Sequence, residues 1–160
     1  MNRKTVIALI IGVLLTAVAV QNVSAYGYRQ SRIGFGVGTP NAVIIYRPAP
    51  FDFRFGYDFS EGNQFIFLSG DWRPTGNIQI NGPLYFYFGL GGYAKFYPEA
   101  ESSEDWFEGG TRLPLGLSLM FLDNVGELFI EVAPGFDLYP KPAFSDDPVQ
   151  VWAGLTFAIR

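Results

Sequence analysis

The sequence of 160 residues contains no cysteine and no histidine, which removes several classes of protein at once. Disulfide frameworks and zinc fingers need these residue types, as do Cys or His nucleophiles and histidine proton shuttles. Charged residues are also scarce at 16% of the chain, whereas an ordinary soluble domain has about 25%. With 11 basic and 15 acidic residues the net charge is −4, so we expect no nucleic-acid partner.

What the chain does contain is glycine, proline and aromatic residues. It has 19 Gly, 11 Pro, 16 Phe, 9 Tyr and 3 Trp, and aromatics make up 18% of all residues. Long stretches of strong helix formers are missing, whereas aromatic residues are typical of strands. The composition therefore indicates an all-β protein without naming its function.

The first 25 residues have the pattern of a secretory signal peptide. Two basic residues precede an uncharged apolar run over 5–20, and Val23-Ser24-Ala25 places small residues where a signal peptidase reads them. The run of about 16 residues is shorter than the ~20 that a membrane-spanning helix needs. We therefore expect an exported protein with a cleaved signal peptide in 1–25 and a single domain in 26–160.

Large apolar residues alternate with small or charged ones through most of 26–160, which is the period of a β-strand. In 51–59, for example, every odd position is aromatic, and the even positions carry Asp52, Arg54, Gly56 and Asp58. Breaks rich in Pro, Gly and Asn divide this pattern into eight strands with no helical segment between them. The predicted strands are 31–39, 42–48, 51–59, 63–73, 83–97, 109–122, 126–139 and 148–160.

The alternation fits two kinds of barrel, because a soluble barrel turns its apolar face inward and a transmembrane barrel turns it toward lipid. Four observations favour the second kind. The apolar faces carry uniformly large side chains that would overfill a small barrel. The opposite faces are rich in glycine, which leaves room for charged side chains to interdigitate. Several runs are long enough for a tilted membrane strand of about 9–11 residues, and aromatics gather near strand ends as in an interfacial girdle.

The sequence also resembles small eight-stranded outer-membrane barrels of the OmpA/OmpX class, and within it the compact barrels of spirochaetes and other diderm bacteria. The resemblance is carried by four segments: Gly34-Phe35-Gly36-Val37-Gly38-Thr39-Pro40, Gly89-Leu90-Gly91-Gly92-Tyr93, Arg112-Leu113-Pro114-Leu115-Gly116-Leu117-Ser118 and Glu127-Leu128-Phe129-Ile130-Glu131-Val132-Ala133-Pro134-Gly135. It implies an antiparallel up-and-down transmembrane barrel in the bacterial outer membrane, inserted by the barrel-assembly machinery. The expected fold is therefore an all-β, eight-stranded antiparallel transmembrane β-barrel.

If the polar faces look inward, the barrel interior holds nine charged side chains: Asp52, Arg54, Asp58, Asp71, Lys95, Arg112, Glu127, Glu131 and Asp137. Charges withdrawn from water persist only when they are paired and hydrogen-bonded. We therefore expect a structural polar network of Asp52, Arg54, Asp71, Arg112, Glu131 and Asp137, in which Arg54 and Arg112 pair with Glu131, Asp71 or Asp52. A conducting or ligand-binding interior, or a catalytic carboxylate pair, stays as an alternative at this point.

An acidic segment between the fifth and sixth predicted strands is the candidate interaction loop. It carries five carboxylates and two aromatics within 98–110 and no basic residue. Binding of a cation or of a basic partner is the functional interpretation, because binding residues usually lie on loops, and a merely solvated loop is the alternative. The candidate residues are Glu99, Glu101, Glu104, Asp105, Trp106, Phe107 and Glu108.

The sequence thus predicts a monomeric outer-membrane β-barrel with a structural or surface-interaction role, in contact with the lipid bilayer and with an extracellular or envelope protein as a candidate partner. We expect no catalysis, no cofactor and no metal. A narrow pore is one alternative function. A soluble periplasmic lipocalin-like barrel that binds an apolar ligand is the other.

Overall fold

The computed structural model describes residues 30–39, 42–59, 64–98 and 106–159, and these residues form strands and turns without a helix. The strands are β1 (Arg32–Gly38), β2 (Ala42–Arg47), β3 (Phe51–Asp58), β4 (Phe65–Trp72), β5 (Ile78–Asn81), β6 (Leu84–Phe88), β7 (Leu90–Phe96), β8 (Phe107–Arg112), β9 (Leu115–Phe121), β10 (Gly126–Tyr139) and β11 (Ala143–Ala158).

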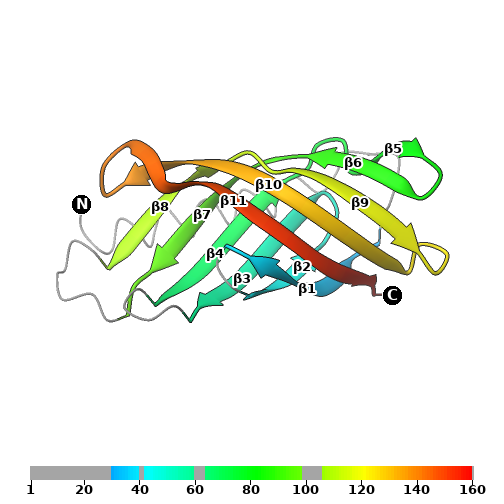
Figure 1. Ribbon diagram of the computed structural model, residues 1–160, viewed down its shortest axis with the longest axis horizontal. Coiled ribbons are helices and arrows are strands. Elements are labelled where there is room, and N and C mark those ends of the chain that lie inside the picture. The colour runs from blue at the N-terminus through cyan, green and yellow to red at the C-terminus, as the bar shows by residue number, and fades with distance from the viewer. Residues whose placement is uncertain (1–29, 40–41, 60–63, 99–105, 160) are drawn as a thin grey trace.

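These elements build a closed barrel of eight antiparallel strands (Figure 1). β6 continues into β7 and β8 into β9, so these four elements make two barrel strands, and β5 is a short ribbon attached to β6. The barrel closes because β1 pairs with both β2 and β11. Neighbouring strands follow one another in the chain, which is the up-and-down order expected from the sequence.

The two long strands are interrupted where Gly89 and Pro114 lie opposite each other. Proline has no N–H to donate to the ladder, and the Gly89 amide donates instead to the Pro114 carbonyl at 2.9 Å. A Cβ at Gly89 would lie 2.9 Å from the Trp72 carbonyl oxygen and 3.0 Å from Pro114 Cγ. A residue without a side chain is therefore needed at this crossing.

The predicted strands agree with the structure at seven of eight positions to within a few residues, and two features were missed. The last strand begins at Ala143 rather than at 148, because Ala143 already pairs with Asp137 beyond a bulge in β10. The segment 74–82, expected to be a loop, contains β5. The dipeptide Asn81-Gly82 is a hairpin signal there, and Gly82 takes a positive φ of 50°.

The alternation places large apolar side chains outside and polar or small ones inside. On β2, Ile44 and Tyr46 point outward and are 60% and 45% exposed, whereas Val43, Ile45 and Arg47 are buried. The same pattern holds on β9, where three leucines are exposed and the residues between them are buried. The barrel is therefore inverted relative to a soluble β-protein, whose apolar face is the buried one.

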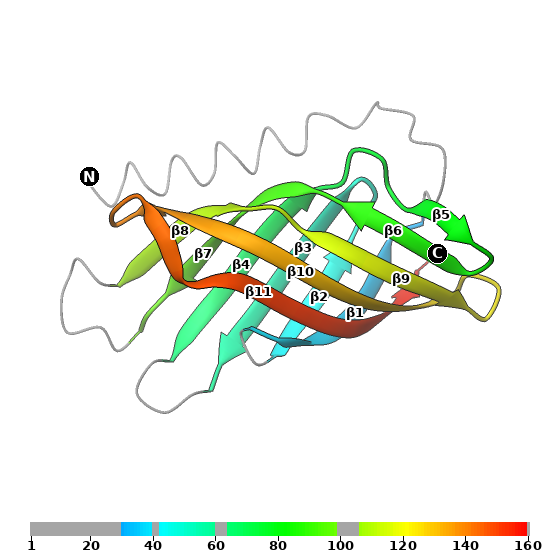
Figure 2. The same ribbon diagram turned by 45° about the horizontal axis from the view of Figure 1, so that its top comes forward.

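The strands run obliquely to the long axis, and the two ends of the barrel differ (Figures 1 and 2). One end carries the β2–β3 turn, the β4–β5 connection and the β9–β10 turn, and the β5–β6 hairpin projects there. We call it the β2–β3 end. The opposite end carries the β10–β11 turn and the start of β8, and we call it the β10–β11 end.

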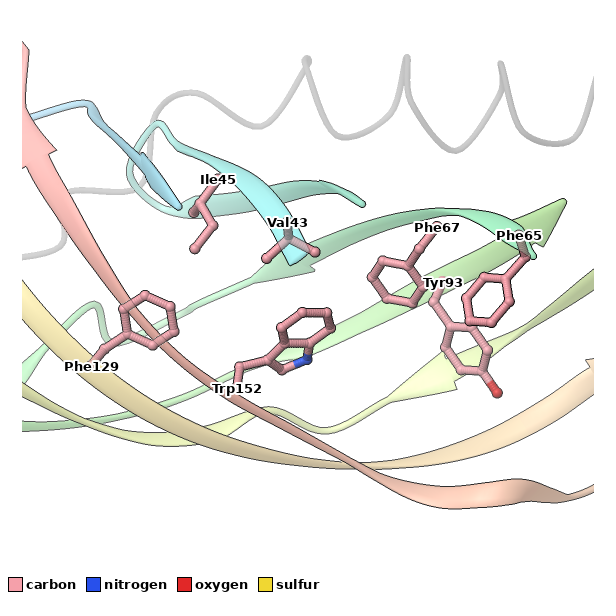
Figure 3. Packing of buried hydrophobic residues seen from close by; sticks show 7 residues of the cluster. All are labelled: Val43, Ile45, Phe65, Phe67, Tyr93, Phe129 and Trp152. Atoms are coloured by element: carbon pink, nitrogen blue, oxygen red, sulfur yellow. The ribbon is translucent and has the colours of Figure 1, made fainter. Parts of the chain in front are cut away.

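An aromatic cluster fills part of the interior. Seven buried side chains from opposite walls face one another (Figure 3): Val43, Ile45, Phe65, Phe67, Tyr93, Phe129 and Trp152. The ring of Trp152 lies 5.7 Å from that of Phe67, and Phe67 in turn stacks on Tyr93 at 6.4 Å. Such aromatic contacts contribute about 0.5–1.5 kcal/mol each beyond the area they bury.

Replacing Gly154 with Ala should lower the free energy of unfolding by about 1–3 kcal/mol, the usual cost of overpacking. The new Cβ would lie 2.8 Å from Gly36 Cα on β1 and 2.8 Å from the Phe129 ring, and the backbone of β1 cannot move away without breaking the β1–β11 ladder. Urea unfolding of the folded protein in detergent micelles measures the change.

Gly70→Ala is the control, because its Cβ would meet only the Phe53 ring at an ordinary 3.4 Å. Its free energy of unfolding should stay within about 0.5 kcal/mol of that of the unmodified protein. Equal midpoints for the two variants would contradict the close packing of β1 on β11.

Candidate functional site

The inward positions of the barrel hold a continuous network of charged side chains. Asp52 and Arg54 lie on β3, Arg112 on β8 and Glu131 on β10, and each is at most 2% exposed. They point inward because residues two apart on a strand share a face. The network therefore follows from the same alternation that puts the apolar residues outside.

Glu131 is the centre of this network. Both of its carboxylate oxygens accept hydrogen bonds from Arg54, at 2.7 and 2.6 Å. Arg112 Nη2 donates to the same carboxylate at 2.5 Å, and the Tyr87 hydroxyl donates to it at 2.9 Å. One carboxylate thus joins three strands across the interior and neutralises part of the charge of two guanidiniums.

Arg112 is held by further partners on the strands two places away from β8 on either side. Its Nε lies 3.0 Å from Asp71 Oδ1 on β4, and its Nη1 donates to Gln150 Oε1 on β11 at 2.7 Å. Arginine presents five N–H donors in a rigid fork, so one side chain can bind several walls at once. Arg112 therefore connects β4, β10 and β11.

A second group of ion pairs lies nearer the β2–β3 end. Arg47 Nη1 donates to Glu127 Oε1 at 2.9 Å, and its Nε donates to Asp52 Oδ2 at 2.8 Å. Glu127 also accepts hydrogen bonds from the hydroxyls of Ser118 and Thr156, at 2.6 and 2.7 Å. Every one of these partners of Glu127 is buried, at 5% exposure or less.

Arg32 and Arg73 border this second group. Arg32 Nε lies 3.0 Å from Glu127, and its Nη atoms donate to the carbonyls of the β9–β10 turn. Arg73, which follows β4, stacks on the Tyr87 ring at 3.8 Å and donates to Asn77 Oδ1. Burial, together with the nearby Arg47, lowers the pKa of the Arg73 guanidinium, although arginine stays charged in proteins.

Five of the six network residues expected from the sequence lie together in the structure. Arg54 contacts Asp52 and Glu131, and Arg112 contacts Asp71 and Glu131. The sixth, Asp137, lies apart from them and accepts a hydrogen bond from the Tyr93 hydroxyl. It is separated because it sits six residues beyond Glu131 on the long β10, toward the β10–β11 end.

Sequence reasoning missed Arg32, Arg47 and Arg73. Arg32 and Arg47 face each other in the β1–β2 ladder. Each lies an even number of residues from inward-facing positions of its own strand. The alternation along the two strands could therefore have predicted that both side chains point inward. Arg73 lies just after its strand, where strand parity no longer determines which way a side chain points.

The β10–β11 end differs from the expectation for the acidic loop. Phe107 and Glu108 belong to β8 rather than to the loop, because the β7–β8 ladder continues to the pair Phe96 and Phe107. Phe107 is 7% exposed, and Glu108 accepts a hydrogen bond from Lys95 Nζ at 2.7 Å.

Of the remaining loop residues, Trp106 is half-buried, and its ring lies 5.5 Å from that of Phe107. Glu99, Glu101, Glu104 and Asp105 lie outside the described residues.

The described residues offer no metal site, since no group of three acidic side chains among them could hold an ion. Over the same part of the chain, no helix is long and apolar enough to span a membrane. Comparisons of this chain with protein-family models, with curated proteins and with solved structures find no match.

Arg112→Ala should lower the free energy of unfolding by about 3–5 kcal/mol, because removing one partner of a buried ion pair leaves the other charge uncompensated. Adding Asp71→Asn to this variant should restore part of the loss, since Arg112 is the partner in the closest ion pair of Asp71 among the described residues. Urea unfolding of the single and double variants measures both changes.

Lys141→Ala, at an exposed position in the β10–β11 turn, is the control. It should change the free energy of unfolding by less than about 0.5 kcal/mol. An unchanged midpoint for Arg112→Ala would mean that Arg112 has no essential partner in the interior.

Proposed function

We propose that this chain is a small outer-membrane β-barrel protein, exported through its signal peptide, with a structural or surface-interaction role and no catalytic one. Its apolar outer wall faces lipid, and its interior is closed by the polar network. The protein acts as a rigid scaffold that carries loops at the β10–β11 end.

The observation that carries this proposal is the inversion of the barrel wall. Every one of the eight strands exposes large apolar side chains, and exposed patches larger than a few hundred Å² are rare on soluble monomers. One such residue from each barrel strand illustrates the coverage: Phe35, Ile44, Phe55, Leu68, Leu90, Leu117, Ile130 and Val151. A wall that is apolar on all sides while the interior is charged suits a lipid environment.

Strand length supports the same proposal. A tilted strand crosses the hydrocarbon core with about 9–11 residues, and β10 with 14 residues and β11 with 16 reach this length. β1 to β4 are shorter, with 6 to 8 residues each. The backbone requirement is also met, because a closed barrel leaves no strand edge to be solvated along its wall.

The filled interior argues against the two alternative functions. A narrow pore needs a continuous water path, but Arg54, Arg112 and Glu131 meet across the middle of the barrel. A lipocalin-like barrel needs an apolar cavity, but here charged and aromatic side chains occupy the inside. We therefore expect no steady conductance in planar bilayers, and a stable open channel would favour the pore.

A surface-interaction role would depend on the segments at the β10–β11 end. The acidic run at 99–105 remains the candidate, because a carboxylate-rich loop next to Trp106 suits a basic partner. Deleting 99–105 leaves β8 and its pairing with β7 intact. Retained binding to an envelope partner after this deletion would exclude the loop as the interaction site.

Membrane fractionation of the native protein tests the proposed location. The protein should sediment with the outer membrane, need detergent for extraction and shift in gel mobility when boiled, as folded barrels do. Recovery in the soluble periplasmic fraction would overturn the proposal.

A matched pair of substitutions tests whether lipid covers the wall. Val132 lies in the middle of β10 and Val125 in the β9–β10 turn, and both are 44% exposed. For protein folded in lipid vesicles, Val132→Arg should lower the free energy of unfolding by about 2–4 kcal/mol and Val125→Arg by at most about 1, because the cost of arginine depends on depth in the bilayer. In a wall that faces water the two variants would behave alike.

A further inference from the structure

A pocket opens at the β2–β3 end of the barrel, and its charged wall is mainly arginine. The β2–β3 turn, the β4–β5 connection and the start of β1 form its rim. Its charged and polar lining consists of Gln30, Arg32, Arg47, Arg73, Asn77 and Glu127. Three guanidiniums thus share the pocket with one carboxylate.

The ion-paired network next to the pocket does not balance these charges, and the other buried charged residues, Asp58, Lys95 and Asp137, lie toward the β10–β11 end of the barrel. Among the described residues the network joins five guanidiniums with four carboxylates, which leaves one positive charge in excess: Arg32, Arg47, Arg54, Arg73 and Arg112 against Asp52, Asp71, Glu127 and Glu131. A buried excess charge is costly unless something compensates it.

The excess is concentrated on Arg73. Its guanidinium is stacked on Tyr87, and its closest carboxylate is Asp52, with Nη1 at 3.8 Å from Oδ2. Asp52 already lies 2.8 Å from Arg47 and 3.2 Å from Arg54. Arg73 is 4% exposed, and its Nε has no hydrogen-bond partner among the described residues. Arg73 is one of the residues that line the pocket, so a charged side chain with an unpaired donor forms part of its wall.

We propose that this pocket is an oxyanion site that binds a phosphate group at Arg73, with the positive charge of the neighbouring Arg47 favouring the anion. The planar guanidinium matches the oxygens of phosphate in a bidentate geometry, and a bound anion would cancel the excess charge. The phosphate is either free inorganic phosphate or the headgroup of a phospholipid at this rim of the barrel. Binding of inorganic phosphate depends on the pocket and not on membrane insertion, so it can fail separately from the proposed function. Binding of a lipid headgroup rests on the proposed function.

Asn77→Asp is the sharpest test, because it adds one negative charge and changes hardly any volume. Arg73 already donates to Asn77 Oδ1, so an aspartate there would neutralise the guanidinium in place and repel an incoming anion. Asn81→Asp is the matched control: it makes the same chemical change on β5, at an exposed position outside the pocket lining.

Isothermal titration of inorganic phosphate into the full folded protein measures the affinity. The buffer should be free of phosphate, at constant ionic strength, and the detergent an uncharged glycoside, because phosphocholine detergents would compete for the site. We expect saturable binding to the unmodified protein, affinity at least tenfold weaker in Asn77→Asp, and unchanged affinity in Asn81→Asp. Arg73→Gln should abolish binding if it folds.

The same titration with a short-chain phosphatidylglycerol below its micelle concentration distinguishes the two sources of phosphate. Binding of inorganic phosphate alone assigns the site to the free anion, and much tighter binding of the lipid assigns it to a headgroup. The absence of saturable binding by either probe, or equal affinity in all of the Asp variants and the unmodified protein, would overturn the proposal.

Discussion

The charge on Glu131 is the constraint on which the rest of the barrel depends. A carboxylate in the interior must be compensated, and two guanidiniums and the Tyr87 hydroxyl reach it from three other strands. Those guanidiniums in turn require Asp52 and Asp71. Each ion pair contributes little net free energy of folding by comparison with apolar packing. Removing one partner alone, however, leaves the other charge buried and uncompensated. The network therefore fixes the relative positions of strands that are not paired with each other, such as β3 and β10.

The same constraint explains why the outer wall can be uniformly apolar. In a soluble barrel the core residues hold the strands together and the outer face must be wetted. Here the interior is held by ion pairs, by hydroxyl groups and by the rings around Trp152, and most of the other large apolar side chains lie on the outer face. Guanidiniums also pack against rings inside, as Arg54 does over Trp152 at 5.6 Å, which joins the polar and aromatic parts into one filling.

Strict alternation made most of the fold predictable from sequence, because parity assigns each strand residue to one face. The ion pairs of Arg54 and Arg112 followed from that assignment and from the cost of buried charge. Arg73 did not, since it lies past the end of its strand and its direction depends on the β4–β5 connection. Asp137 was correctly predicted to face inward, but it was wrongly grouped with the central ion pairs. The alternation shows which face of the strand a residue occupies and not how far along the barrel axis it lies from another inward residue.

The ring is closed by the two strands that are farthest apart in the chain. Arg32 on β1 donates to Thr156 on β11, 124 positions away, and both contact Glu127. Contacts between such distant segments form late and slowly. Without β11, Glu127 would lack the hydroxyl of Thr156, and the wall would stay open between β1 and β10. The last strand of the chain therefore both seals the wall and completes the hydrogen bonding of a charge inside it.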